Sequence, residues 1–189
     1  MKKTSFLLIH GLGGSGPQHW QSWLYTQLEE RKFDVHFPTF SDFDRPVKDI
    51  WLEELSVCLE NIPPENEIIV LTHSLGSILW MHYAATPLKS KVRQVILVAP
   101  PSPVRTLSDA QTFFPVPLDE AQLVNAAEST WLVMSTDDPF CSIEESTLFL
   151  KLGLPAIAFP KSGHLNTASG HGEWPWILNT CLKKEFSFT

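Results

Sequence analysis

The chain has 189 residues, of which 43% are hydrophobic and 19% are charged, a composition typical of a globular protein rather than a disordered or membrane-spanning one. Its length fits a single domain over residues 1–189. The formal net charge of −7 argues against a nucleic-acid-binding surface, so we expect no nucleic-acid partner.

Signals for targeting, disulfides and metal binding are weak. The apolar run that ends at His10 is only about five residues long, whereas the apolar region of a signal peptide needs roughly seven to fifteen. No stretch approaches the ~18 apolar residues of a membrane span. Cys58, Cys141 and Cys181 show no C-x-x-C spacing, and the chain has no H-E-x-x-H motif. We therefore expect a cytoplasmic protein that binds neither a membrane nor a metal.

Short β-type runs alternate with helical patterns along the chain, which is typical of βα units on a parallel sheet. The expected strands lie near 5–9, 33–37, 67–72, 92–98, 130–135 and 155–159. The expected helices lie near 19–31, 47–61, 75–85, 119–127, 143–151 and 174–184. Several strand runs are apolar almost throughout, as parallel strands buried on both faces are. The sequence predicts an α/β protein with one open, mostly parallel sheet and helices on both faces.

The stretch near 100–118 interrupts this alternation. From Pro100 to Pro117 it contains five prolines and shows no helical period. We expect a short, irregular, cap-like insertion here rather than a linker between domains.

A candidate nucleophile follows the third expected strand. In an open parallel sheet, ligands bind at the carboxyl ends of the strands, and there the chain reads THSLG over 72–76. This resembles the G-x-S-x-G turn that lifts a serine hydroxyl above the sheet, with Thr72 in place of the first glycine. Ser74 is then the candidate nucleophile. Taken alone, the motif is equally consistent with Ser74 as a helix N-cap.

A base and an acid follow two later strands. A nucleophilic serine needs a base to accept its proton and a carboxylate to orient that base. Asp137 and Asp138 follow the fifth expected strand and His164 follows the sixth, which is the chain order Ser, Asp, His of α/β-hydrolases. Spacing alone does not separate Asp137 from Asp138. His171 is the rival for the base.

The glycine-rich stretch HGLGGSG over 10–16 has two interpretations. It satisfies the G-x-G-x-x-G pattern of dinucleotide-binding loops, which also require an acidic residue at the end of the second strand. The second strand ends without one, since Asp34 lies at its beginning. The alternative is an oxyanion loop, in which case we expect the backbone N–H groups of Leu12 and Leu75 to be the donors. No cofactor is then implied.

The segments THSLGSILWMHYA, STDDPF and SGHLNTASGHGEWP resemble those of small serine hydrolases related to retinoblastoma-binding protein nine and bacterial YdeN. The resemblance extends from Ser5 to about Leu182. It implies a minimal α/β-hydrolase fold with sheet order 2-1-3-4-5-6. It also implies that Ser74 is the nucleophile, that His164 is the base, and that the carboxylate before Pro-Phe, Asp138, is the acid.

These features predict a serine hydrolase of the carboxylesterase type that cleaves esters with small or hydrophobic acyl groups through an acyl-enzyme. The expected partner is a small-molecule ester. The alternative is a catalytically weak protein-binding module. The retinoblastoma-binding relative carries an L-x-C-x-E segment, but its counterpart here, residues 56–60, lacks the leading leucine, so that partner function is not expected. His19, at the start of a helix near the site, and the aromatic residues Phe113, Phe114 and Trp174 are candidates for the substrate pocket.

Overall fold

The computed structural model describes residues 3–88 and 91–183. Its six strands are β1 (Thr4–Ile9), β2 (Asp34–His36), β3 (Glu67–His73), β4 (Val92–Val98), β5 (Ala127–Ser135) and β6 (Ala156–Phe159). Its α-helices are α1 (Trp20–Glu30), α2 (Lys48–Glu60), α3 (Leu75–Ala84), α4 (Glu120–Ala126), α5 (Ile143–Leu150) and α6 (Pro175–Leu182). Two 3-10 helices are η1 (Ser108–Phe113) and η2 (Thr167–Ser169).

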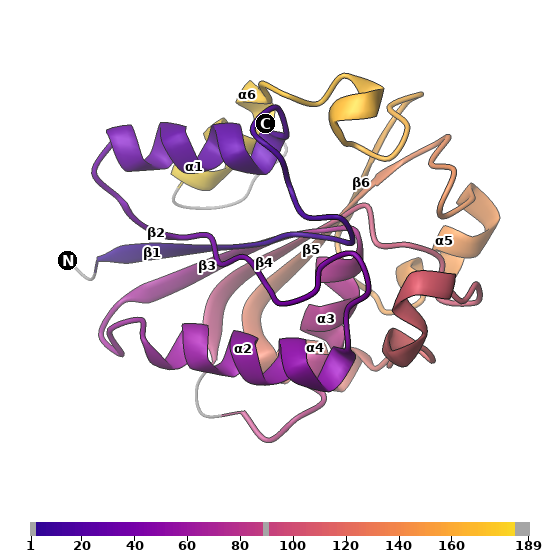
Figure 1. Ribbon diagram of the computed structural model, residues 1–189, viewed down its shortest axis with the longest axis horizontal. Helices are drawn as coiled ribbons and strands as arrows, with labels where there is room; N and C mark the ends of the chain where they lie inside the picture. The colour runs from indigo at the N-terminus through magenta and orange to yellow at the C-terminus, as the bar shows by residue number, and fades with distance from the viewer. Residues whose placement is uncertain (1–2, 89–90, 184–189) are drawn as a thin grey trace.

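The strands form one sheet in the order β2-β1-β3-β4-β5-β6, in which every neighbouring pair is parallel. This is the predicted order. The helices α1 and α6 cover one face of the sheet, and α2, α3 and α4 cover the other (Figure 1). The arrangement is that of an open, doubly wound sheet.

The apolar strands explain why the sheet needs cover on both faces. Successive side chains of a strand point to opposite faces. In β1, Phe6 and Leu8 pack with Trp20 of α1, whereas Leu7 and Ile9 pack with Trp51 of α2. Both sets are almost fully buried. Removing so much apolar surface from water is the main force that holds the two helical layers on the sheet.

Two segments differ in detail from their predictions. The strand expected at 130–135 begins at Ala127, because Ala127 pairs with Val92 of β4 directly after α4 ends. The stretch 100–118 is not irregular throughout, since it contains η1. Phe113 at the end of η1 is buried, and its ring contacts that of Trp51 edge to face, with centroids 5.4 Å apart.

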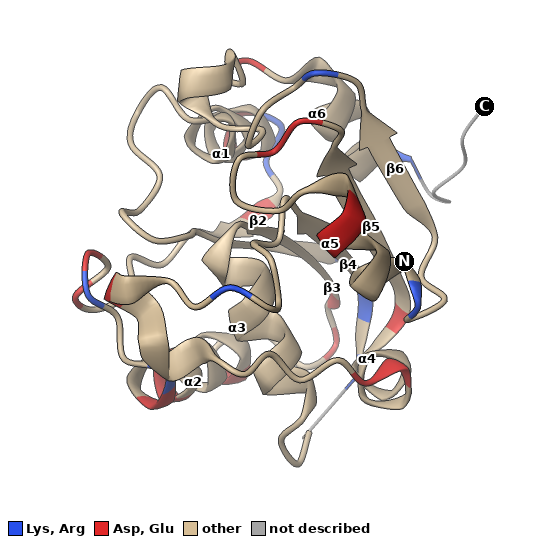
Figure 2. Ribbon diagram, turned by 90° about the vertical axis from the view of Figure 1, so that its right-hand side faces the viewer, with Lys and Arg blue, Asp and Glu red and all other residues tan. Residues whose placement is uncertain are grey.

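The register brings the strand ends to one edge of the sheet. Ile9 pairs with Thr72, His73 with Val98, and Ser135 with Phe159. The strands run from left to right in Figure 1, and Figure 2 is turned so that this edge faces the viewer. Loops that are far apart in the sequence therefore meet there.

Lys and Arg positions on this side are dispersed among Asp and Glu positions (Figure 2). Among the described residues seen in this view, they form no basic stripe along a helix. Within residues 3–88 and 91–183, no helix has the length and apolar character needed to cross a bilayer.

Candidate active site

Ser74 lies in a sharp turn between β3 and α3. Its backbone is in an unusual conformation for a non-glycine residue, with φ 53° and ψ −122°. Such a conformation costs on the order of 1–3 kcal/mol and persists only where the surrounding structure imposes it. The hydroxyl does not cap α3. It lies instead 2.9 Å from Nε2 of His164. The geometry thus favours the nucleophile interpretation of this motif over the helix N-cap.

The turn accommodates Thr72 where other hydrolases have glycine. Thr72 is buried, and its hydroxyl lies 2.7 Å from that of Ser77 and donates to the carbonyl of Ile96 at 3.3 Å. The Ser77 hydroxyl in turn lies 3.2 Å from the carbonyl of Val98. These bonds satisfy both buried hydroxyls and tie the turn to β4, so Thr72 is a structural member of the turn.

His164 joins Ser74 to a buried carboxylate. Its Nδ1 lies 2.8 Å and 3.0 Å from the two carboxylate oxygens of Asp138. The side chains of His164 and Asp138 are only 7% and 3% exposed. The backbone N–H of Phe140 donates to the same carboxylate at 2.8 Å. A continuous hydrogen-bonded chain therefore runs from Ser74 through His164 to Asp138, the geometry that activates a serine.

The adjacent carboxylate, Asp137, has a different environment. It is exposed and accepts hydrogen bonds from the Ser135 hydroxyl and the Gly163 N–H, both at 2.8 Å. These bonds, that of Ser135 first, lower the pKa of the Asp137 carboxyl. Asp137 thus ties the loop after β5 to the loop that carries His164.

The rival base, His171, packs against the ring of Trp174, with centroids 5.1 Å apart. Its Nδ1 lies 3.4 Å from the hydroxyl of Ser169. The Ser74 hydroxyl is hydrogen-bonded to Nε2 of His164 instead, so the geometry favours His164 over His171.

The glycine-rich loop lies directly against the turn at Ser74. A Cβ at Gly11 would be 2.8 Å from the Ser74 Cβ and 3.4 Å from the Leu75 nitrogen. Leu12 follows in a turn closed by the Gly14 N–H on the Gly11 carbonyl at 3.2 Å, a bond that does not use the Leu12 N–H. As the first residue of α3, Leu75 has an N–H with no acceptor inside its own helix. Leu75 thus follows Ser74 directly, and Leu12 lines the same cavity as Ser74.

His10 holds this loop in place. Its Nδ1 donates to the Gly11 carbonyl at 2.8 Å, and its Nε2 accepts the N–H of Phe40 at 3.0 Å. This pair of bonds requires the neutral ring with its proton on Nδ1. Burial lowers the pKa of His10, in agreement with that state.

A cavity of about 390 Å³ opens at Ser74. Besides Ser74 it is lined by Leu12, Gly14, Gly16, His19, His73, Leu107, Phe140, His164, Asn166, Thr167 and Ala168. His19 is therefore on the cavity wall, as expected. Phe140 and Asn166 were not predicted to line the cavity. Phe140 lies two residues after Asp138, and Asn166 lies two residues after His164.

The aromatic pocket candidates lie elsewhere. Phe113 is buried against Trp51, Phe114 packs on the same core, and Trp174 belongs to the core on the other face of the sheet. None of these three lines the cavity at Ser74, which corrects the sequence-based expectation. Core packing buries Phe113 and Trp174 and partly buries Phe114.

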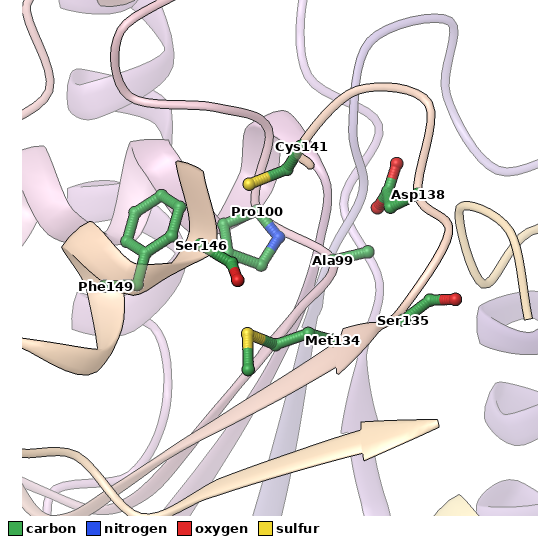
Figure 3. Close-up of a pocket in the computed structure, with 8 residues that line it drawn as sticks. All are labelled: Ala99, Pro100, Met134, Ser135, Asp138, Cys141, Ser146 and Phe149. Atoms are coloured by element: carbon green, nitrogen blue, oxygen red, sulfur yellow. The ribbon is translucent and has the colours of Figure 1, made fainter. Parts of the chain in front are cut away.

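A second, much smaller cavity of about 10 Å³ lies behind Asp138, with Ser135, Cys141 and Ser146 among its lining residues (Figure 3). This is roughly the space of one water molecule. Burial, and then the charge of Asp138, raise the pKa of the Cys141 thiol to about 12. A neutral thiol therefore lies near the carboxylate, which is shielded from bulk water on this side.

His73, next to Ser74 in the chain, supports His164 from behind. Its Nε2 donates to the His164 carbonyl at 3.0 Å, and the two rings lie 5.0 Å apart. The His19 ring contacts the other side of His73, with centroids 4.7 Å apart. Burial first, and then His164, lower the pKa of both His73 and His19, that of His19 to about 4.

We expect the free energy of unfolding to fall as the pH drops from about 6.5 to about 4. His19 has an ordinary pKa of 6.5 and a pKa of about 4 in the folded protein. The unfolded chain therefore binds a proton in this window that the folded protein does not, and stability on the order of 3 kcal/mol is lost. Urea titrations at pH 7 and pH 4.5 measure the difference. His19→Asn, which keeps a capping side chain, should reduce it, and an unchanged difference would contradict this assignment.

The sheet order, the helices on both faces and the turn at Ser74 define an α/β-hydrolase fold. A family model described as serine hydrolase matches residues 6–183, and the chain belongs to this family. The predicted resemblance to YdeN-type hydrolases is thereby confirmed.

Solved structures share this fold. The ydeN gene product of B. subtilis is 18% identical with a TM-score of 0.78, over 95% of this chain and 97% of that one. A YdeN-like hydrolase from Pectobacterium atrosepticum is 20% identical with a TM-score of 0.75, over 94% and 88%. The esterase domain of a Rhodothermus marinus protein is 15% identical with a TM-score of 0.65, over 91% and 83%. No curated protein matches the chain.

Proposed function

We propose that this serine hydrolase cleaves carboxylic esters through an acyl-enzyme formed on Ser74. The observation that carries the proposal is the continuous chain of contacts from the Ser74 hydroxyl to His164 Nε2, at 2.9 Å, and from His164 Nδ1 to Asp138, at 2.8 Å. The esterase domain among the proteins that share the fold supports the same class of reaction.

In the first half of the reaction, the Ser74 oxygen attacks the ester carbonyl while His164 Nε2 accepts the hydroxyl proton. The Asp138 carboxylate accepts the Nδ1–H bond, which keeps Nε2 free to act as the base and stabilises the imidazolium that forms. The tetrahedral intermediate then expels the alcohol, which takes the proton from His164. Water activated by the same histidine releases the acid and restores Ser74.

The negative oxygen of the tetrahedral intermediate needs donors at fixed positions. The N–H groups of Leu12 and Leu75 are the proposed donors, since Leu75 follows Ser74 directly and Leu12 lines the same cavity. Neither N–H is used by the turn or by the helix that begins there. One such donor is typically worth roughly 10²–10³ in rate.

The cavity indicates the kind of ester. Its volume is about 390 Å³, and Leu12, Leu107 and Phe140 contribute apolar side chains to its wall. This size and lining favour a small or hydrophobic acyl group.

A fluorophosphonate probe tests the proposal, because it reacts with an activated serine. We expect the probe to label the wild type on Ser74, as located by mass spectrometry of the peptides. Ser74→Ala and His164→Ala should each abolish labelling while retaining the wild-type circular dichroism spectrum.

Strong labelling of Ser74→Ala would contradict the assignment. A folded wild type that is not labelled would favour a protein-binding role without catalysis.

A further inference from the structure

Phe140 has an accessible aromatic ring at the cavity that opens at Ser74. The residue lines this cavity and is 45% exposed, whereas Phe113, a pocket candidate from the sequence, is fully buried. The Phe140 ring packs on the imidazole of His164, with centroids 4.5 Å apart and planes inclined by 57°. Apolar surface that a bound molecule can cover therefore lies beside the proposed base.

The backbone of Phe140 is fixed on both sides of the residue. Its N–H donates to the Asp138 carboxylate at 2.8 Å, and its carbonyl accepts the N–H of Ser102 at 2.9 Å. Arg105, from the same segment as Ser102, donates to the carbonyl of Pro139 at 3.3 Å. The ring is thus carried by a backbone that is joined to the acid and to the insertion after β4. None of these bonds uses the Phe140 side chain, so a substitution there leaves their groups in place.

The contact with His164 indicates which part of an ester the ring meets. In ester hydrolysis His164 gives its proton to the leaving alcohol, so the alcohol oxygen comes within hydrogen-bond distance of Nε2, which lies 2.9 Å from the Ser74 hydroxyl. Because the Phe140 ring packs on this same imidazole, the carbons attached to the alcohol oxygen come next to it. Leu107 of the insertion adds a second apolar side chain to the cavity wall.

We propose that the Phe140 ring packs against the alcohol part of the ester, and that the enzyme prefers esters of apolar alcohols, aromatic ones above all. Contact between the ring and an apolar alcohol removes both surfaces from water, and two aromatic rings attract each other beyond this burial. Phe140 is then a specificity-determining residue. This inference rests on the proposed ester hydrolysis at Ser74.

Two esters of matched size test the preference. Benzyl butyrate and 2-(2-methoxyethoxy)ethyl butyrate share the acyl group, and their alcohol parts have the same number of non-hydrogen atoms, but one is aromatic and the other is a polar ether chain. Acid release at constant pH gives kcat/KM for each, and we expect the wild type to prefer the benzyl ester. The ratio of the two values should fall by about 5- to 10-fold in Phe140→Ala, which lacks the ring.

Three further variants separate specificity from a structural effect. Phe140→Gln covers the case in which the alanine variant does not fold, and the same fall in the ratio is expected because its side chain is polar and has no ring. Phe140→Tyr keeps the ring and should keep the wild-type preference. Leu150→Ala is the matched control, because Leu150 at the end of α5 is similarly exposed, at 42%, but does not line the cavity. Its ratio should equal that of the wild type.

A wild type without preference for the benzyl ester, or an unchanged ratio in the folded Phe140→Ala and Phe140→Gln variants, would overturn the role of Phe140. If the ring only supported His164, the two esters would lose rate by the same factor and their ratio would not change. Fluorophosphonate labelling of the same preparations separates this failure from failure of the proposed function. Labelled Ser74 with an unchanged ratio contradicts only the role of Phe140, whereas unlabelled wild type contradicts both.

Discussion

Asp138→Asn is expected to lower kcat for a simple ester by about 10⁴-fold, because the asparagine amide can donate to His164 Nδ1 and so favour the wrong tautomer of the ring. His164 Nε2 would then carry the proton and could not accept that of Ser74. Asp138 is buried and receives the Phe140 N–H at 2.8 Å, so its position leaves little freedom for a replacement to move away. Steady-state hydrolysis of p-nitrophenyl butyrate measures the effect, with circular dichroism to establish that the variant is folded.

The neighbouring residue provides the matched control. Asp137→Asn retains an acceptor oxygen for the Ser135 hydroxyl and the Gly163 N–H, and Asp137 is exposed rather than in contact with His164. Its rate should stay close to that of the wild type. Equal losses in the two variants, or a small loss in Asp138→Asn, would show that Asp138 is not the acid.

Gly76→Ala should destabilise the whole protein, by an amount on the order of 3 kcal/mol. A Cβ at Gly76 would lie 2.6 Å from the carbonyl oxygens of both Ile9 and His10. These are backbone atoms of the last residue of β1 and of the residue that follows it, so neither can move without disturbing the sheet and the glycine-rich loop together. Urea-induced unfolding measures the loss, and a variant that yields no folded protein would agree with it.

Gly16→Ala is the control for this prediction. Within residues 3–88 and 91–183, a Cβ at Gly16 would meet no atom within 4 Å apart from those of its chain neighbours. The free energy of unfolding should therefore stay within about 0.5 kcal/mol of the wild type. If Gly76→Ala is as stable as Gly16→Ala, the turn at Ser74 does not pack against β1 as closely as the structure indicates.

The fold was predictable because its signals are local and repeated. The apolar runs of β3 and β4 predict strands buried on both faces, and their observed bounds agree closely with the expected ones. The order of strands came from the resemblance to a family, since alternation alone does not state which strands are neighbours. The start of β5 was missed because its first residues owe their conformation to pairing with β4, not to their own pattern.

The candidate site was predictable where chain order and chemistry agree. The positions of Ser74, Asp138 and His164 after successive strands indicated one edge of the sheet, and the structure brings them within hydrogen-bond distance. The substrate pocket was not predictable in the same way. Phe113 lies in the insertion after β4 and Trp174 follows the loop of His164, yet core packing buries both.

The sequence by itself determined the α/β class and the edge of the sheet where the site lies, because both follow from strand periodicity. It also determined the residues that supply a hydroxyl, an imidazole and a carboxylate, because these follow from residue type. Only the tertiary structure separated the adjacent carboxylates of Asp137 and Asp138 by geometry, and only it placed His19 on the wall of the cavity at Ser74. The physical reason is that hydrogen-bond geometry and burial depend on contacts between segments that lie far apart in the chain.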